Sequence, residues 1–402
     1  MWRWLLLVSL VIAAHGQEVR RAIPVGTTNW DEQAKFIGGV PIESSSELAA
    51  LQKRGSYTQH SAQFEKLWVR YRDNYFGPMR QWSYLELTPR IRGQAPVLYF
   101  FGGPDVLSVL ALYPEATDFL LGGLEPVYPM PAVQSLEPAA RETALANVRN
   151  STDVILSFGH FITKEMKADF DATELKGVVP VMLALLAISG AEVLDVAPFF
   201  VLRDGQAVDG GTVAGAGLPG VRFTFRMMDS PVVRRIHYVQ ANVANDALKS
   251  NDSVLAWARA YGQGNVYLKA ASYLMHESYF STIRSFLLEQ GQSVLQDDSG
   301  IPFAAFRDGA WRLWFFGVYA GTLEIFAKYQ QPDLGTAFAA AGVPLPFGTG
   351  YKWQRGQSNL LLAVKQEAPR AIPVTEAPVQ PTGSPPPLLP PVSVEPEVVT
   401  SP

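Results

Sequence analysis

The stretch that decides the fold is VLYFFGGPD, residues 97–105. Its five leading apolar residues predict a buried strand, and the glycines and proline that follow predict a sharp turn. We expect a short helix at residues 106–113, and TDFLLGGL at residues 117–124 has the composition of a second strand. A strand, a helix and a strand in this order are typical of a parallel sheet covered by helices.

The same alternation continues along the chain. We expect helices at residues 136–149, 158–169, 178–189, 253–261, 279–290 and 322–329, and strands at residues 192–201, 221–226, 234–240, 265–271, 293–296, 311–318 and 360–364. The strands near residues 192–240 are interpreted as a β-rich insertion. The predicted fold class is therefore α/β, a Rossmann-like layered domain over residues 96–365 with a mostly parallel sheet.

Residues 1–16 are typical of a cleaved secretory signal peptide. Arg3 supplies the positive charge, residues 4–14 form the apolar segment, and AHG at residues 14–16 offers a small-x-small cleavage site. The apolar run is too short to cross about 30 Å of hydrocarbon. We therefore expect an exported protein, periplasmic or secreted, without a transmembrane span.

Two further segments flank the α/β region. Residues 17–95 are expected to be irregular up to residue 45 and helical at residues 46–54 and 61–75. Residues 366–402 are rich in proline, which fixes φ and removes a backbone donor, so they cannot build a helix or a sheet. We expect a disordered tail, with binding of a partner protein as the alternative.

Composition excludes several kinds of chemistry. The 402 residues include no cysteine, which excludes disulfides, thiolate metal sites and a cysteine nucleophile. A net charge of −4 and the lack of a long basic run give no sign of a nucleic-acid partner. An apolar content of 48% and a mean hydropathy of +0.06 are those of a globular protein.

The turn after the first predicted strand is the first candidate site. Gly102 and Gly103 follow that strand, Asp105 comes next, and Glu125 ends the second strand. A glycine turn with an acidic residue after the next strand is the layout of nucleotide and S-adenosylmethionine pockets. The chain has no G-x-G-x-x-G, Pro104 lacks an amide for a phosphate, and export argues against a cytoplasmic cofactor. We expect no such cofactor, and either a plain tight turn or a site that uses the two carboxylates differently.

The stretch KAASYLMH, residues 269–276, is the second candidate. A lysine buried in a strand has a lowered pKa and can act as a base, which is the role considered for Lys269. Ser272 and His276 form a nucleophile–base pair only if the turn folds them together. No G-x-S-x-G is present, which disfavours an ordinary α/β-hydrolase. A hydrogen-bonding network at a strand end is the alternative.

The stretch QDDSGIP, residues 296–302, is the third candidate. Asp297 and Asp298 are adjacent carboxylates that can hold a metal or share a proton, although Asp-Ser-Gly is also a good turn. His160 is a fourth candidate binding residue. Ligands for a divalent metal could come from His160, His276, Asp105 and Asp297 together. No H-E-x-x-H spacing supports a metal site, so whether a metal binds stays open.

Four of these segments resemble those of an uncharacterised family of exported bacterial proteins: FGGPD at residues 101–105, GLEPV at 123–127, KAASYLMH at 269–276 and QDDSGIP at 296–302. The resemblance covers roughly residues 60–365. It implies a bacterial, exported protein, and it implies no activity and no catalytic residues.

The candidates share one position, the carboxyl ends of predicted strands, and in a parallel sheet those ends lie along one edge. The leading functional hypothesis is a hydrolase that acts on an ester, a lactone or a similar small extracellular molecule. In it His276 or Lys269 is the base, and Asp105, Glu125 and residues 297–298 orient groups or hold a metal. The alternatives are a binding protein without chemistry and a structural envelope protein whose tail contacts a partner.

Overall fold

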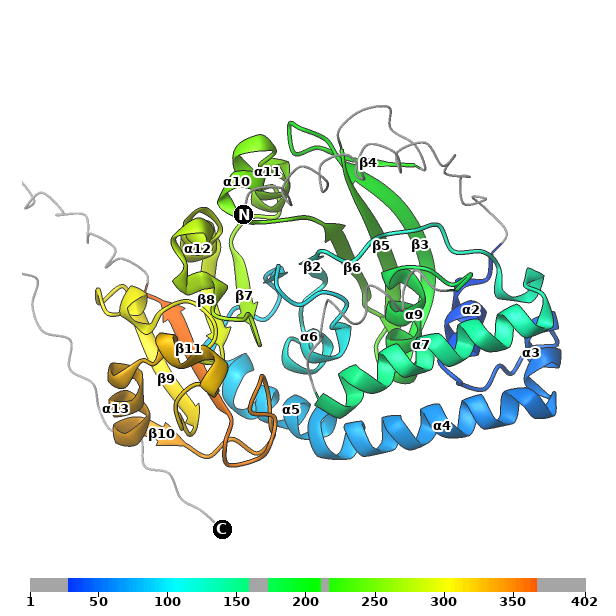
Figure 1. The fold of residues 1–402 in the computed structure, drawn as a ribbon, viewed down its shortest axis with the longest axis horizontal. Helices are drawn as coiled ribbons and strands as arrows, with labels where there is room; N and C mark the ends of the chain where they lie inside the picture. Colours follow the sequence, from blue (N-terminus) through cyan, green and yellow to red (C-terminus); the bar gives the residue numbers. More distant parts are fainter. Residues whose placement is uncertain (1–27, 159–172, 211–216, 367–402) are drawn as a thin grey trace, which may run out of the picture. The chain divides into compact units, whose positions relative to one another are not determined.

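The computed structural model describes residues 28–158, 173–210 and 217–366 (Figure 1). Four predictions lie outside these residues: the signal peptide at residues 1–16, the helix at 158–169, the candidate His160 and the proline-rich tail beyond residue 366.

The strands of the described residues form one sheet of 11 strands in the order β10-β9-β11-β8-β7-β1-β2-β6-β5-β3-β4. Their bounds are β1 Val97–Tyr99, β2 Asp118–Gly123, β3 Ala191–Val201, β4 Ala207–Asp209, β5 Leu218–Met227, β6 Val233–Gln240, β7 Gly264–Leu268, β8 Gly291–Gln296, β9 Trp311–Gly317, β10 Gly342–Val343 and β11 Asn359–Lys365. The mixed α/β class is confirmed.

The sheet is less parallel than predicted. The centre, β8-β7-β1-β2-β6, is parallel throughout. β5, β3 and β4 continue it on one side in antiparallel fashion, and β11 is antiparallel to both β8 and β9 on the other. The prediction of a mostly parallel sheet was wrong because an apolar run such as β11 fits a buried sheet in either direction.

The strands near residues 192–240, which were predicted as a β-rich insertion, all belong to the one sheet. β6 pairs in parallel with β2 over its full length, so it belongs to the centre of the sheet. β5 and β3 then extend the same sheet outward from β6. Pairing partners depend on contacts between distant segments, which the local composition does not specify.

Helices cover the sheet. Their bounds are α2 Trp30–Ile37, α3 Glu47–Gln52, α4 Gly55–Tyr71, α5 Gly77–Trp82, α6 Val106–Leu112, α7 Pro138–Phe158, α9 Val178–Ile188, α10 Asn245–Ser250, α11 Ser253–Arg259, α12 Ser281–Gln290 and α13 Pro332–Ala341. Side chains that alternate along the strands belong to two separate hydrophobic clusters: Val97 and Tyr99 to one, Leu98 and Phe100 to the other. The first cluster includes α2, α4, α6, α7 and α9, and the second includes α11, α12 and α13, so both faces of the sheet are covered.

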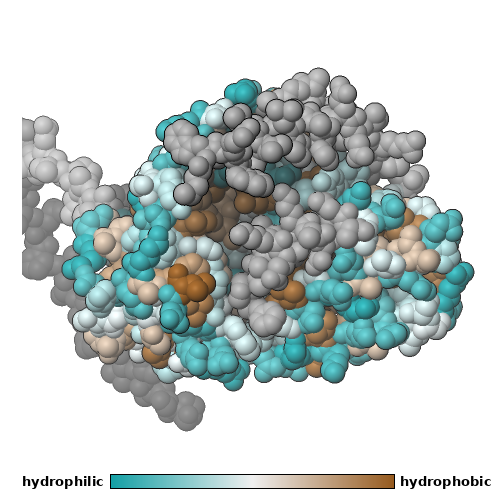
Figure 2. Space-filling view, in the orientation of Figure 1, coloured by the Kyte–Doolittle hydropathy of each residue, from teal (hydrophilic) through white to brown (hydrophobic). Residues whose placement is uncertain are grey.

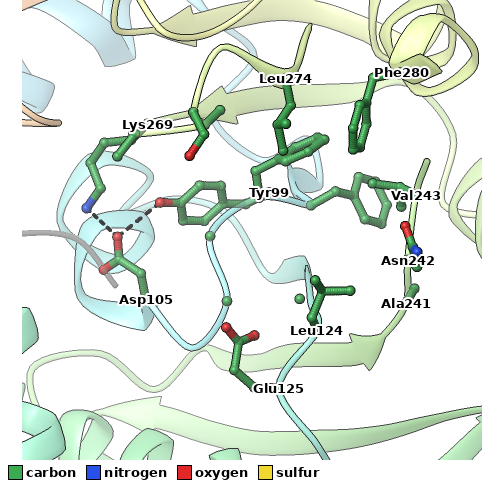
Figure 3. A pocket seen from close by; sticks show the side chains of 18 of the residues that line it. Tyr99, Asp105, Leu124, Glu125, Ala241, Asn242, Val243, Lys269, Leu274 and Phe280 are labelled. Atoms are coloured by element: carbon green, nitrogen blue, oxygen red, sulfur yellow. Dashed lines mark hydrogen bonds and ion pairs between the residues drawn. The ribbon is translucent and has the colours of Figure 1, made fainter. Parts of the chain in front are cut away.

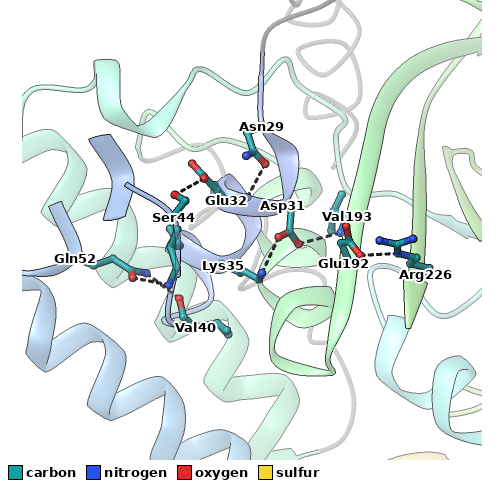
Figure 4. A network of polar contacts seen from close by, with 11 residues as sticks. Asn29, Asp31, Glu32, Lys35, Val40, Ser44, Gln52, Glu192, Val193 and Arg226 are labelled. Carbon is teal, nitrogen blue, oxygen red and sulfur yellow. Dashed lines mark hydrogen bonds and ion pairs between the residues drawn. The ribbon is translucent and has the colours of Figure 1, made fainter. Parts of the chain in front are cut away.

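α2 lies in the region that was expected to be irregular. Asn29 caps its first turn by accepting a hydrogen bond from the Glu32 amide. Asp31 pairs with Lys35 at 2.7 Å and also accepts a hydrogen bond from the amide of Val193 in β3 (Figure 4). These contacts and the burial of its apolar side chains hold α2 against the sheet.

The surface of the visible face is mostly hydrophilic, with hydrophobic side chains scattered among polar ones (Figure 2). Single exposed apolar residues of this kind are ordinary in globular proteins. None of the helices in the described ranges has the length and apolar character needed to cross a bilayer.

Candidate functional site

A cavity of about 180 Å³ lies at the carboxyl ends of β1, β2, β6 and β7 (Figure 3). Four of the predicted site residues line it: Asp105, Glu125, Lys269 and Ser272. They come from three separate stretches of sequence, and the parallel centre of the sheet brings these stretches to one edge.

Asp105 and Lys269 form a buried ion pair at one end of the cavity. The Lys269 ammonium lies 2.5 Å from Oδ2 of Asp105, and the side chains are only 5% and 2% exposed. Asp105 caps α6 by accepting from the Ser108 amide, and it also accepts from the Tyr99 hydroxyl. Lys269 donates a second hydrogen bond to the Ser108 hydroxyl at 2.9 Å. The lysine therefore acts as a hydrogen-bond donor here, and this arrangement does not support the predicted role of a free base.

Glu125 is a second buried carboxylate, 3% exposed, that points into the cavity (Figure 3). The Tyr238 hydroxyl lies 3.0 Å from both Oε2 and the backbone carbonyl of Glu125. Burial, followed by the charge of Glu125, raises the pKa of Tyr238, so the phenol keeps its proton and donates it. Among the described residues no cation forms an ion pair with Glu125, which leaves acceptor positions for a donor in the cavity.

Two glycines make room for Glu125. A Cβ on Gly123 would lie 2.2 Å from Oε2 of Glu125, and one on Gly103 would lie 3.3 Å from the same atom. Gly103 also has a φ of +53°, a conformation that side chains rarely adopt. The glycines of the two strand ends are therefore needed for the position of this carboxylate as well as for the turn.

The remaining wall of the cavity is mostly apolar. Its apolar lining residues are Phe100, Phe101, Leu124, Ala241, Val243, Leu274 and Phe280. The amide side chain of Asn242, from the loop between β6 and α10, lies near Ala241 and Val243 (Figure 3). The cavity thus places an acidic end and an apolar end within one small volume.

The turn after β7 is strained and well supported. Ala270, Ser272 and Tyr273 all have φ between 50° and 55°, which is uncommon for residues other than glycine. The Ala270 amide donates to Asp297, and the Tyr351 hydroxyl donates to the Ala270 carbonyl at 2.9 Å. Strained backbone conformations that neighbouring contacts hold in place are frequent at binding sites.

Asp297 supports this turn through hydrogen bonds and does not line the cavity. It accepts hydrogen bonds from the Ala270 amide and from the amide and hydroxyl of Ser299. Burial, with the neighbouring Asp298, raises the pKa of Asp297 to about 6. The Asp298 carboxylate has other partners. It accepts one hydrogen bond from the Tyr273 hydroxyl at 2.5 Å and one from the side-chain amide of Asn359 at 2.9 Å.

The structure does not bring Ser272 and His276 together as a nucleophile–base pair. The Ser272 hydroxyl lies 2.7 Å from the Tyr351 hydroxyl, whereas the His276 ring packs edge-on against the stacked rings of Tyr273 and Tyr329 and does not line the cavity. Burial, followed by the positive charge of Arg284, lowers the pKa of His276 to about 4. Leu274 and Phe280, on either side of His276 in the chain, line the cavity, whereas the His276 ring packs against the two tyrosines.

The predicted metal ligands are also dispersed. Within the described residues, no three His, Asp or Glu side chains are grouped so that they could hold a metal ion. Asp105 lines the cavity, Asp297 lies under the turn and His276 lies beyond it.

Sequence reasoning missed several residues of the site. Asn242, which lines the cavity, follows β6, and applying the strand-end rule to β6 would have found it. Tyr238, which donates to Glu125, lies within β6 and behind the lining. Tyr351 comes from a loop far along the chain, and no local pattern marks it.

Comparisons with protein-family models, with curated proteins and with solved structures found no match for this chain. The function therefore has to be argued from the cavity itself.

Proposed function

We propose that this protein binds a small, phosphate-free ligand that carries vicinal hydroxyls on a sugar ring next to an apolar or aromatic group, as a nucleoside does. The observation that carries the proposal is Glu125, a buried carboxylate that faces the cavity with a single protein side-chain donor, Tyr238, among the described residues. A buried carboxylate needs further donors, and two neighbouring hydroxyls of a ligand supply them with matching geometry.

The strand order supports the same proposal. Counted along the chain, the five parallel strands stand in the order third, second, first, fourth, fifth, from β6 to β8. This is the order of a Rossmann-like, doubly wound sheet, in which ligands bind at the carboxyl ends beside the first strand. In such sheets an acidic residue after the second strand accepts hydrogen bonds from ribose hydroxyls, and Glu125 has this position.

The charges of the cavity argue against a phosphate. Asp105 occupies the N-terminus of α6, where the amides of a nucleotide-binding helix would meet a phosphate. The charge of Lys269 balances that of Asp105, so the lining keeps one net negative charge, that of Glu125. A neutral or cationic ligand fits these charges, and the apolar wall with Phe101 and Phe280 suits its ring.

Isothermal titration calorimetry tests the proposal with adenosine as the probe. We expect adenosine to bind, and 2′,3′-dideoxyadenosine, which lacks both hydroxyls, to bind at least roughly a hundredfold more weakly, since each hydrogen bond to a charged group is worth about 1.5–3 kcal/mol. AMP should also bind more weakly than adenosine, because its phosphate would add negative charge beside Glu125. S-adenosylmethionine is a cationic nucleoside and serves as a second probe. Glu125→Gln should weaken adenosine binding, and the exposed Glu289→Gln should not. Equal binding of adenosine and its dideoxy analogue would refute the recognition of a diol.

Hydrolysis of an ester or a lactone in the same cavity is the second proposal. It is favoured by Lys269 and Ser272, which place an ammonium group and a hydroxyl beside one small cavity. We expect turnover of p-nitrophenyl esters or simple lactones to fall at least tenfold in Ser272→Ala. Turnover unchanged in Ser272→Ala and in His276→Ala would remove this candidate.

Export is proposed on the basis of residues 1–16. Cell fractionation and N-terminal sequencing test it, and the mature chain should begin at Gln17 outside the cytoplasm. A cytoplasmic chain that keeps Met1 would overturn the proposal without affecting the ligand.

A further inference from the structure

A second cavity of about 270 Å³ lies between α4, α7 and the loop that joins α3 to α4. It shares no lining residue with the first cavity. The first turns of both long helices contribute to its lining, with Arg54 and Tyr57 on one side and Pro138 and Arg141 on the other. Nothing in the proposed function depends on it.

The lining of this second cavity is strongly positive. Three arginines line it, Arg54, Arg141 and Arg149, and Glu142 is the one acidic residue among the described lining residues. In the described part of the chain, no carboxylate forms an ion pair with any of the three arginines. A group of cations without matching carboxylates attracts an anion.

His60 holds Arg149 in place without neutralising it. Nε2 of His60 lies 2.9 Å from the Ile37 carbonyl and must carry the proton, because a carbonyl only accepts. Nδ1 of His60 is then the acceptor that faces Nη1 of Arg149 at 3.3 Å. Burial lowers the pKa of His60 to about 4, so the imidazole is neutral at pH 7 and the arginine keeps an uncompensated charge.

Arg141 is almost fully buried, with 8% of its surface exposed. Its guanidinium donates one hydrogen bond, 3.1 Å long, from Nη1 to the Leu136 carbonyl. A guanidinium has five N–H donors, and burying its charge is unfavourable unless an anion or further acceptors balance it. An oxyanion in the cavity would supply both the charge and the acceptors.

The two helices add to the positive potential. α4 and α7 lie side by side and run in the same direction, with both starting near α3 (Figure 1). The N-terminal turns of both line the cavity, and no side chain caps the start of α4. The partial positive charges of two helix N-termini therefore act on the same space.

Part of the cavity is apolar. Phe36, Leu51, Leu145 and Ala146 line it beside the ring of Tyr57. An inorganic ion would leave this part unfilled, whereas a ligand with a short hydrocarbon chain would remove it from water.

We propose that this second cavity binds an amphipathic oxyanion, with a carboxylate or phosphate headgroup held by the three arginines and an apolar chain against Phe36 and Leu145. The headgroup accepts hydrogen bonds from Arg54, Arg141 and Arg149. The apolar chain sets the preference over small inorganic anions.

Calorimetric titration of the full chain tests this proposal with four probes, each below its aggregation concentration: octanoate, octyl phosphate, inorganic phosphate and 1-octanol. We expect octanoate or octyl phosphate to bind at least tenfold more tightly than inorganic phosphate and 1-octanol. Whichever of the two binds more tightly identifies the headgroup. Binding should also weaken as salt is raised.

Single arginine variants locate the site. Arg149→Gln and the exposed Arg54→Gln should each weaken binding of the tighter probe by roughly tenfold, as expected for a lost hydrogen bond to a charged group. Arg72→Gln is the matched control, because Arg72 follows α4, is exposed and pairs with Asp73. Circular dichroism and Tm check that each variant is folded.

Three results would overturn the proposal. They are no saturable binding of either amphipathic anion, equal binding of 1-octanol and octanoate, or the same loss of affinity in Arg72→Gln as in Arg149→Gln.

Discussion

The Lys269 ammonium lies 2.5 Å from the Asp105 carboxylate, with both side chains almost fully buried and 164 residues apart in the chain. The pair joins the end of β7 to the first turn of α6 and closes one end of the cavity. Each of the two buried charges compensates the cost of removing the other from water.

Breaking this pair on one side should destabilise the fold strongly. Lys269→Met leaves Asp105 buried without its cation, so the free energy of unfolding should fall by about 3 kcal/mol or more. Urea denaturation measures it. Lys249→Met is the control, because Lys249 and Asp246 are paired at the surface, and its effect should stay below about 1 kcal/mol.

A double variant separates pairing from packing. Lys269→Met combined with Asp105→Leu removes both buried charges, and much of the lost stability should return. If the stability that the double variant loses relative to the native chain equals the sum of the two single losses, the two residues are not coupled, and the ion pair does not have the role given to it.

The hydroxyl of Tyr238 should matter more than that of another fully buried tyrosine. Tyr238→Phe removes the side-chain donor to Glu125 and should lower the free energy of unfolding by roughly 1–3 kcal/mol. Tyr113→Phe is the matched control, because the Tyr113 hydroxyl is buried without a hydrogen-bond partner in the described residues. Its removal should be neutral or stabilising, and the opposite order of the two variants in urea denaturation would contradict the role given to Tyr238.

The stability supported by Asp297 should decrease as the pH rises. Its pKa in the fold is raised to about 6 from a reference value of 3.8, so between these values the folded protein binds more protons than the unfolded chain. Unfolding free energy therefore falls between about pH 4 and pH 6 on account of this group. Asp297→Asn should remove this fall, which urea denaturation at pH 4, 5, 6 and 7 would reveal as a steeper gain of stability with pH in the variant. Parallel profiles for the two proteins would show that Asp297 does not titrate in this range.

The sequence predicted strands better than their pairing. β2, β3 and β6 were found within a residue or so, because continuous or alternating apolar runs bounded by turns are visible locally. The direction and the neighbours of β11 were not predicted, because they depend on which distant strands are available to pair with it. α2 was missed although Asn29 followed by Glu32 is a helix-start signal, since the helix is only eight residues long and is followed directly by two glycines, Gly38 and Gly39.

Part of the site was predicted from the positions of residues at strand ends. The strand-end rule identified Asp105, Glu125 and Lys269 because a parallel centre gathers its carboxyl ends at one edge. It failed for His276, because three residues with left-handed φ, Ala270, Ser272 and Tyr273, shape the turn before it, and nothing in Ala, Ser or Tyr predicts such a conformation. The three arginines of the second cavity come from α7 and the start of α4, which the strand-end rule does not consider.

A methyl group at Gly123 should disturb the acidic end of the first cavity without touching its apolar wall. The new Cβ would lie 2.2 Å from Oε2 of Glu125, 2.6 Å from the Tyr238 hydroxyl and 3.0 Å from Cα of Gly103, so the carboxylate must move. Gly123→Ala should therefore weaken adenosine binding at least as much as Glu125→Gln and should lower Tm, since overpacking of this kind costs about 1–3 kcal/mol. Gly55→Ala is the control: no atom lies within 4 Å of its Cβ position, and alanine favours the first turn of α4, so Tm should stay or rise slightly. If Gly123→Ala bound adenosine as the native chain does, the carboxylate of Glu125 would not be the group that recognises the ligand.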